Sequence, residues 1–205
     1  LLTGRKPKLG KKYMRIITIK TFPSISTPGV FNCFNYLNFE YRWVSRFSCL
    51  SKMDAQKQIR DYKQKWHQQI VSLISYLKMA ITNTPASETA VDENAVNNYQ
   101  DASDALVEVG NDSVAEGYYT MTMMVFGDTQ EQADELCKQV METINSLNYV
   151  AMEETDNAIE AWRGSLPGNY KCNIRSALVS SLNFSHFAPT TCQWSGDKMN
   201  ECLKG

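Results

Sequence analysis

The feature that most restricts the fold of this chain is a pattern that occurs twice along it. Residues 13–50 run from a strand-like segment through a helical period to a second strand-like segment, and residues 118–153 follow the same order. Between them, apolar residues recur every three or four positions, which is the period of an amphipathic helix. Neither an all-helical nor an all-strand fold fits this order, so the sequence predicts a mixed α and β domain.

The first half begins with YMRIITIKTF (13–22), which is rich in β-branched residues and typical of a strand buried on both faces. Thr27 followed by Pro28 indicates a helix N-terminus. One face of a short helix then falls on Val30, Phe34 and Leu37. The segment EYRWVSRFSCL (40–50) alternates, with Arg42 and Arg46 opposite its aromatic side chains, and this predicts a half-buried strand.

The second half repeats this order with clearer boundaries. YYTMTMMVF (118–126) alternates apolar residues with threonines, as a strand does. Thr129 and Gln132 have the spacing of a capping box, which indicates the start of a helix. The apolar face of that helix is Ala133, Leu136, Val140, Ile144 and Leu147. YVAME (149–153) predicts a short final strand.

The segment between the halves predicts an antiparallel helical hairpin over residues 53–110. Ser51 and Asp54 form a capping box at its start, and TNTPAS (82–87) interrupts it. The first apolar stripe is Ile59, Tyr62, Trp66, Ile70, Leu73, Leu77 and Ile81, and the second is Val91, Ala95, Tyr99, Ala102, Leu106 and Val109. Two strand–helix–strand halves around such an insertion predict an α+β, ferredoxin-like sandwich with an antiparallel four-stranded sheet and its helices on one face.

The remaining segments lie at the two ends. Residues 1–12 predict a basic, irregular lead-in, and residues 13–153 predict the platform domain that contains the hairpin. Residues 154–205 predict a short helix, a turn and an extended linker. Because the first residue is Leu1, we expect the chain to be a piece of a longer protein.

Charge is unevenly distributed, although the formal net charge is only −1. Residues 1–52 hold ten basic side chains and one acidic one, whereas residues 86–160 hold seventeen acidic side chains and one basic one. This pattern is typical of two solvated faces of opposite sign. It also allows a second reading, in which the basic segment meets a polyanion or an acidic partner.

The targeting and redox signals are weak. No signal peptide is visible, and the most apolar window, IVSLISYLKMAI (70–81), is too short to span a bilayer. The six cysteines include no C-x-x-C pair, and a domain of this size does not need disulfides. We therefore expect a reduced, cytoplasmic protein.

The sequence gives little support to a nucleotide-binding P-loop, a zinc site or a nucleophile paired with a histidine. The only Gly-Lys pair, Gly10-Lys11, precedes Lys12 and so lacks the Ser or Thr of a P-loop. Cys172, His186, Cys192 and Cys202 do not have the close paired spacing of a zinc site, so we expect no metal. Two histidines, His67 and His186, could pair with a Ser or Cys nucleophile, but the sequence offers many chance partners.

Nucleic-acid binding is the alternative function that the residues favour next. A ferredoxin-like sheet can present aromatic side chains for base stacking, and Tyr13 and Tyr118 are candidates. The electrostatic contribution would come from Lys6, Lys8, Lys11 and Lys12. The expected RNA-recognition strings are absent, and strand aromatics more often belong to a core.

Five blocks of sequence occur in a specific order along the chain. They are PKLGKKYMRIITIKTFPSISTPGVF, FEYRWVSRFSCLSK, EAWRGSLPGNYKCNIR, SSLNFSHFAPTTCQWSG and KMNECL. Together they resemble the N-terminal region of the TrbE-like proteins in the CagE/TrbE/VirB family of conjugative transfer and type IV secretion ATPases. The resemblance runs from about Pro7 to Leu203.

The resemblance implies a bacterial protein that is peripheral at the cytoplasmic side of the inner membrane. It also implies that ATP and magnesium belong to a RecA-like, C-terminal ATPase domain, so this fragment itself would be neither catalytic nor cofactor-binding. The expected partners are that ATPase domain, inner-membrane secretion-channel proteins and further copies in a homo-oligomer.

The block EAWRGSLPGNYKCNIR (160–175) is then the best candidate for a docking edge. We expect Asn157 to cap a short helix, Trp162 to anchor it and Gly164 to end it. The candidate turn and interface residues are Trp162, Gly164, Leu166, Pro167, Gly168, Asn169 and Arg175. The prediction is a structural turn that redirects the chain toward the motor domain, and not a phosphate cradle.

Overall fold

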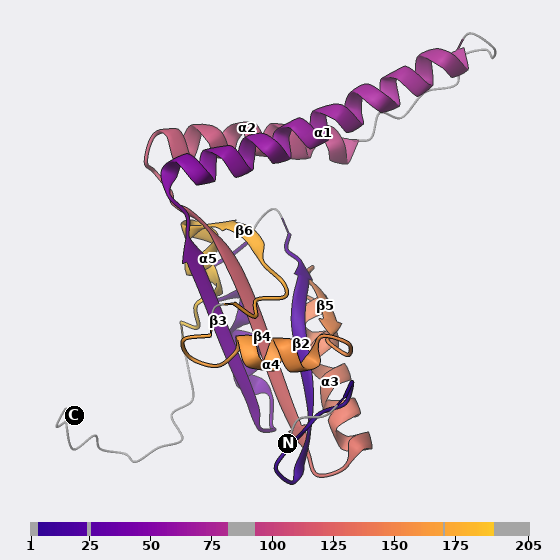
Figure 1. The fold of residues 1–205 in the computed structure, drawn as a ribbon, viewed down its shortest axis with the longest axis vertical. Helices are drawn as coiled ribbons and strands as arrows, with labels where there is room; N and C mark the ends of the chain where they lie inside the picture. Colours follow the sequence, from indigo (N-terminus) through magenta and orange to yellow (C-terminus); the bar gives the residue numbers. More distant parts are fainter. Residues whose placement is uncertain (1–3, 24–25, 82–92, 170, 191–205) are drawn as a thin grey trace, which may run out of the picture. The chain divides into compact units, whose positions relative to one another are not determined.

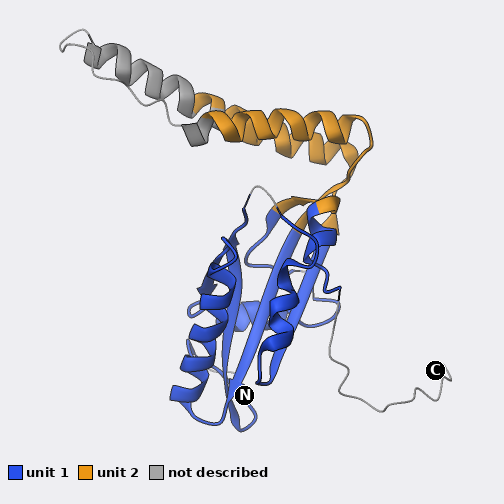
Figure 2. Cartoon of the chain, turned by 180° about the vertical axis from the view of Figure 1, so that it is seen from behind, with its two compact units in different colours: residues 1–47, 119–177, 183–205 blue, residues 48–118, 178–182 orange. Residues whose placement is uncertain are grey.

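The structure is a computed structural model, and it describes residues 4–23, 26–81, 93–169 and 171–190. The chain divides into two compact units (Figure 2). Unit 1 contains residues 1–47, 119–177 and 183–205, and unit 2 contains residues 48–118 and 178–182. The predicted turn at TNTPAS lies outside the described residues, as do the side chains of the hairpin's first apolar stripe from Trp66 onward.

The first half contains β2 (Lys12–Thr21), η1 (Val30–Tyr36) and β3 (Tyr41–Cys49). The helical segment is a 3-10 helix and not the α-helix that the sequence suggests, and Gly29 is its N-cap with φ 68°. Phe31 and Phe34 explain this geometry, because a 3-10 helix aligns positions three residues apart. Their rings stack with centroids 5.4 Å apart, and both are buried.

The second half follows the predicted order with β4 (Glu116–Gly127), α3 (Gln130–Asn145) and β5 (Val150–Glu153). The Thr129 cap is confirmed, since Gln132 N donates to Thr129 Oγ1 at 3.2 Å. The Gln132 side chain in turn accepts from Asp128 N at 2.8 Å. Gly127 allows the tight connection from β4 into α3, because a Cβ there would collide with the backbone of Ala133.

The strands form one sheet in the order β1-β2-β4-β3, with β5 also paired to β2 (Figure 1). The pairs β2–β4 and β2–β5 are antiparallel, and β1 (Lys8–Leu9) forms a small hairpin with β2. The α+β class is therefore confirmed. The order β5-β2-β4-β3 among the four predicted strands is compatible with the ferredoxin-like arrangement.

Helices cover both faces of this sheet, whereas the sequence predicted them on one. On one face, α4 (Ala158–Gly164) packs Ala158 and Ala161 against Met14, Ile16 and Met124. Figure 1 shows α4 crossing β2 and β4 on the side opposite α3. The physical reason lies in β2, where six consecutive residues from Met14 to Ile19 are buried, so both sides of the strand need a cover.

The other face carries an aromatic core. Its members are Phe22, Phe31, Phe34, Trp43, Tyr119, Tyr149, Phe184 and Phe187. Tyr119 is only 1% exposed, and its hydroxyl lies 3.0 Å from Ser45 Oγ on β3. Edge-to-face and tilted ring pairs of this kind add stabilisation beyond the area they bury.

The segment after residue 153 begins with the predicted short helix, α4. Asn157 is its N-cap residue but makes no side-chain capping hydrogen bond. Two further elements follow that the sequence did not predict, β6 (Ala177–Ser180) and α5 (Ser181–Phe187). β6 pairs with β4, and Phe187 of α5 belongs to the aromatic core.

Unit 2 is built on the predicted hairpin of α1 (Lys52–Ile81) and α2 (Glu93–Gly110). Ala55, Ile59 and Val109 form its buried core. The Ser51 cap is present, because Asp54 N donates to Ser51 Oγ at 3.2 Å. Figures 1 and 2 show the two helices lying side by side.

Candidate docking site

The turn that follows α4, residues 164–169, is held in place by two arginines of β3. Arg42 Nη2 donates to the carbonyl oxygen of Ser165 at 2.9 Å. Arg46 Nη1 donates to the carbonyl of Asn169 at 2.5 Å, and its Nη2 donates to the carbonyl of Leu166 at 3.2 Å. We call residues 164–169 the α4 turn.

Two glycines give the α4 turn its shape. Gly168 has φ 80°, a conformation that side-chain-bearing residues rarely adopt. Gly164 lies so close to Cys172 that a Cβ would collide with the Cys172 carbonyl oxygen. Trp162 packs, partly buried, against the Met14–Met124 cluster just before the turn, so the helix end is anchored on the sheet.

The hydrogen bonds of the α4 turn fit a structural turn. The N–H groups of Ser165, Leu166 and Asn169 donate to backbone carbonyls within the helix end and the turn. The carbonyls of the turn meanwhile face arginine guanidinium groups. A phosphate cradle needs several free, converging N–H groups, and these three are already used.

Arg175 secures the segment that follows. Its Nε donates to Glu154 Oε1 at 2.8 Å and its Nη2 to Glu154 Oε2 at 3.3 Å. Glu154 is 2% exposed and also accepts from Thr18 Oγ1 at 2.6 Å. This hydrogen bond with Glu154 raises the pKa of Arg175, so the guanidinium stays charged. The candidate residues therefore all lie on the α4 face of the sheet. Arg175, however, binds the buried Glu154 and is not part of the exposed turn.

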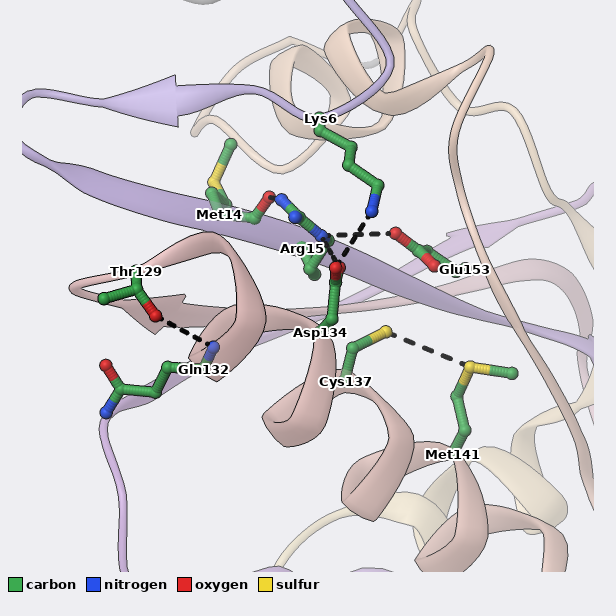
Figure 3. A network of polar contacts seen from close by, with 9 residues as sticks. All are labelled: Lys6, Met14, Arg15, Thr129, Gln132, Asp134, Cys137, Met141 and Glu153. Atoms are coloured by element: carbon green, nitrogen blue, oxygen red, sulfur yellow. Dashed lines mark hydrogen bonds and ion pairs between the residues drawn. The ribbon is translucent and has the colours of Figure 1, made fainter.

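A second polar network lies on the α3 face (Figure 3). Arg15 is 1% exposed, and its Nε donates to Asp134 at 2.6 Å and lies 3.5 Å from Glu153. The hydrogen bond from Arg15 holds the pKa of Asp134 below its usual range. Lys6 adds a second contact to Asp134 at 2.9 Å. A pocket of about 330 Å³ opens beside this network.

The basic lead-in is largely engaged with other parts of the chain. Lys6 binds Asp134, and Lys12 binds Glu40 at 2.6 Å. The Lys8 ammonium lies 3.8 Å from the Tyr13 ring centroid, so it covers one of the two aromatics considered for base stacking. One sheet face is covered by α4 and the other by α3 and the aromatic core, which leaves little room for a nucleic-acid platform.

The comparison with known proteins gives the family. A model described as "CagE, TrbE, VirB family, component of type IV transporter system" matches residues 2–91 and 86–175. The chain belongs to this family. It is 30% identical over 199 residues to a probable conjugal transfer protein TrbE of Sinorhizobium fredii, a match that covers 97% of this chain and 29% of that protein.

Other relatives agree with this assignment. The conjugal transfer protein TrbE of Rhizobium radiobacter is 28% identical over 97% of this chain and 24% of that protein. The type IV secretion system protein virB4 of Brucella suis is 22% identical over 85% of this chain and 18% of that protein. The chain thus spans less than a third of the length of these curated relatives.

In this CagE/TrbE/VirB family member, one histidine lies within hydrogen-bonding distance of a serine. His186 Nδ1 lies 2.9 Å from Ser26 Oγ, and Ser26 also donates to Asn183 Oδ1 at 3.0 Å. The same histidine's carbonyl accepts from Gly29 N at 3.0 Å, so this cluster ties the start of η1 to α5. His67 lies instead on α1, where its ring is 5.9 Å from that of Tyr99.

The cysteines of the described part of the chain give little support to a nucleophile or a metal site. Cys33, Cys49, Cys137 and Cys172 are free thiols there. Burial raises the pKa of Cys137 to about 12 and also raises that of Cys33, which disfavours the reactive thiolate. Among the described residues no group of three potential metal ligands occurs, and Cys192 and Cys202 lie outside them. Within the same limits, no helix is both long and apolar enough to cross a bilayer.

Sequence reasoning missed the residues that organise the α4 turn. It placed Arg42 and Arg46 together on one side of β3 but gave them no role, and it did not identify Arg15 or Glu154. The available signal was two arginines, four positions apart, on the face opposite the aromatic residues of a half-buried strand. That signal predicts that polar groups pack on this face of the strand. It does not identify them, because the carbonyls of Ser165 and Asn169 are more than 100 residues away in sequence.

Proposed function

We propose that this chain is the non-catalytic N-terminal platform of a TrbE-like ATPase that powers conjugative DNA transfer and type IV secretion. In this proposal the ATP- and magnesium-dependent chemistry belongs to the C-terminal region of the parent protein. The platform binds the inner-membrane channel proteins and holds the motor domain, and the parent is peripheral to the inner membrane. Family membership and the names of the relatives support this proposal.

The observation that carries the docking role is the construction of the α4 turn. Its carbonyls are fixed by Arg42 and Arg46, while Pro167 and Gly168 at its tip remain exposed. A turn that is held rigidly at its base loses little conformational entropy when its tip binds a partner. Such a turn is suited to present a preformed edge to a neighbouring protein.

The proposal is tested in the full-length parent protein by changing the tip of the turn. Pro167→Asp should lower the frequency of conjugative transfer at least about tenfold, because a charge at the centre of an interface costs several kcal/mol. The matched control is Lys20→Asp, which changes an exposed residue on β2. Protein abundance and ATP turnover should stay at the wild-type level in both variants. Transfer at the wild-type frequency with Pro167→Asp would refute the docking role of the turn.

A further inference from the structure

The strand β3 forms one edge of the sheet, because among the described strands it pairs with β4 alone (Figure 1). None of its nine residues is fully buried, whereas most residues of the neighbouring β4 are. Ser45, in the middle of β3, is exposed. An edge strand of this length presents a row of backbone N–H and C=O groups to which a further strand can bind.

The backbone groups of β3 that point away from the sheet belong to its odd-numbered residues. Leu50 N donates to the carbonyl of Glu116 at the start of β4 at 2.8 Å. Backbone groups alternate between the two sides of a strand as its side chains alternate between the two faces. Counting back from Leu50 in steps of two, the even-numbered residues face β4 and the odd-numbered residues from Tyr41 to Phe47 face outward. Among the described backbone hydrogen bonds outside the ladders, none involves residues 41–47.

The α4 face of this edge carries two positive charges that no described carboxylate balances. Arg42 and Arg46 lie on that face and are only partly buried. Both donate to backbone carbonyls, and Arg46 also donates to the Asn173 side chain, so all these acceptors are neutral. The ion pairs that the structure describes include none for either arginine. Hydrogen bonds to neutral acceptors leave both charges in place.

The opposite face of the same edge is apolar. Trp43 packs edge to face on Phe31 and Phe34, with ring centroids 5.5 and 5.1 Å apart. Phe47 stacks on Phe184 with centroids 4.5 Å apart. Trp43 and Phe47 both remain partly exposed. A strand added at this edge would therefore meet apolar side chains on one face and two arginines on the other.

We propose that β3 binds an extended acidic segment of a partner protein as an additional antiparallel strand. Two carboxylates of that segment, four residues apart, lie beside Arg42 and Arg46, and its apolar residues lie beside Trp43 and Phe47. Cross-strand neighbours on one face are close enough for their side chains to pair. The antiparallel direction is chosen because its ladder is slightly more stable per residue. The edge of β3 is a different surface from the tip of the α4 turn, so the proposal does not depend on the docking role of that turn.

Backbone chemistry and charge favour this occupant over others. A nucleic acid or a lipid headgroup supplies phosphate oxygens, which accept from N–H groups but leave the outward carbonyls of β3 without a donor. A second copy of β3 would place its own arginines on the same face as Arg42 and Arg46, and like charges directly opposite each other are destabilising. An acidic strand supplies donors, acceptors and the two opposite charges together.

The test uses the full 205-residue chain and a capped synthetic peptide, Thr-Glu-Ile-Val-Ile-Glu-Thr, whose glutamates share one face. Calorimetric titration measures binding, and NMR follows hydrogen exchange of the backbone amides. The peptide should slow exchange at Trp43, Ser45 and Phe47 but not at Val44 and Arg46, which already face β4. Replacing both glutamates with lysine should weaken binding at least about tenfold, and raised salt should also weaken it.

N-methylation of the peptide separates strand addition from general electrostatic attraction. Methylating the two isoleucine amides should abolish binding, because in an antiparallel pair they donate to β3. Methylating the two glutamate amides should change the affinity less than about threefold, because they point away from β3. Equal effects of the two modifications would overturn the proposal. So would a peptide that does not bind, or anionic phospholipid vesicles that slow exchange at residues 41–47 when the peptide does not.

Ser45→Pro tests the same contact from the protein side, since it removes one outward N–H. Proline is tolerated on an edge strand where the missing N–H faces solvent, so the variant should fold, and circular dichroism checks this. Its affinity for the peptide should fall at least about tenfold. Ser45→Ala is the matched control, because it loses the same contact with the Tyr119 hydroxyl but keeps the N–H, and it should bind as the wild type does.

A folded Ser45→Pro variant with wild-type affinity would contradict the proposal. If Ser45→Pro does not fold, the two methylated peptides decide with the unchanged chain. The docking role of the α4 turn is tested separately by Pro167→Asp, so either proposal can fail while the other stands.

Discussion

At the residue scale, the α4 face depends on arginines that bind backbone carbonyls and one carboxylate at buried or partly buried positions. Arg46 alone donates to Asn169, Leu166 and the Asn173 side chain. Hydrogen bonds from a charged donor contribute more than neutral ones, and an acceptor that loses its donor inside the protein pays its desolvation cost. The Arg46 side chain of β3 therefore stabilises the α4 turn, which lies far away in the sequence.

Arg46→Ala should lower the free energy of unfolding by roughly 2–3 kcal/mol, because three acceptors lose a charged donor. Hydrogen exchange at the amides of Leu166 and Asn169 should accelerate at the same time. Arg163→Ala is the matched control, since its side chain is 52% exposed and pairs with Glu160, which is only three residues away. Equal effects of the two substitutions would contradict the role assigned to Arg46.

Glu116 supplies a pH-dependent prediction in unit 2. Burial, and secondarily the charge of Glu108, raises the pKa of Glu116 to about 7. The folded state therefore binds the proton more tightly than the unfolded state does, and stability falls as pH rises from about 4.5 to about 7. The loss should reach at most about 3 kcal/mol and remain constant above that range.

The change Glu116→Gln should remove this contribution, because an amide does not ionise. Urea unfolding of the full chain between pH 5 and pH 8, followed by hydrogen exchange in the hairpin, measures the difference. Glu131→Gln, an exposed change on α3, should leave the pH dependence as it is in the wild type. A Glu116→Gln variant with the wild-type pH slope would show that this carboxyl does not carry the effect.

At the element scale, α4 is short but covers one face of the sheet. It contributes only Ala158 and Ala161 to the buried core, and Trp162 supplies the larger contact at its end. A helix of seven residues has little stability of its own, so this packing must hold it.

Trp162→Ala should therefore destabilise the α4 segment by about 2 kcal/mol, less than a fully buried indole would cost, because Trp162 is only partly buried. Thermal unfolding by circular dichroism gives the change in stability. Tyr36→Ala is the control, since its side chain is 83% exposed and its loss should change little. An unchanged melting curve for Trp162→Ala would rule out the anchor role.

Elements whose sequence signals come from neighbouring residues could be predicted, whereas elements that depend on residues far away in the sequence could not. The hairpin and α3 were predictable because Ser51, Asp54, Thr129 and Gln132 mark helix starts within four residues. The 3-10 geometry of η1 depends on stacking of Phe31 with Phe34 against the aromatic core, which the 3.6-residue period does not encode. β6 consists of four residues whose partner is β4, so no local pattern distinguishes it from a loop.

At the scale of the whole molecule, the α4 turn is the surface proposed for docking, and Arg42 of β3 holds its base. The sheet itself is occupied on both faces by its own helices, so it serves as the scaffold. This chain covers only 29% of one TrbE relative and 18% of a virB4 relative, so most of each relative lies outside the shared region.

The central claim is that this chain presents surfaces and performs no ATP chemistry. The most direct test measures ATP turnover by the purified 205-residue chain beside the full-length parent protein, at equal concentration with magnesium. We predict turnover by the parent and none above buffer by the chain. Turnover by the chain that a single substitution within it abolishes would contradict this claim.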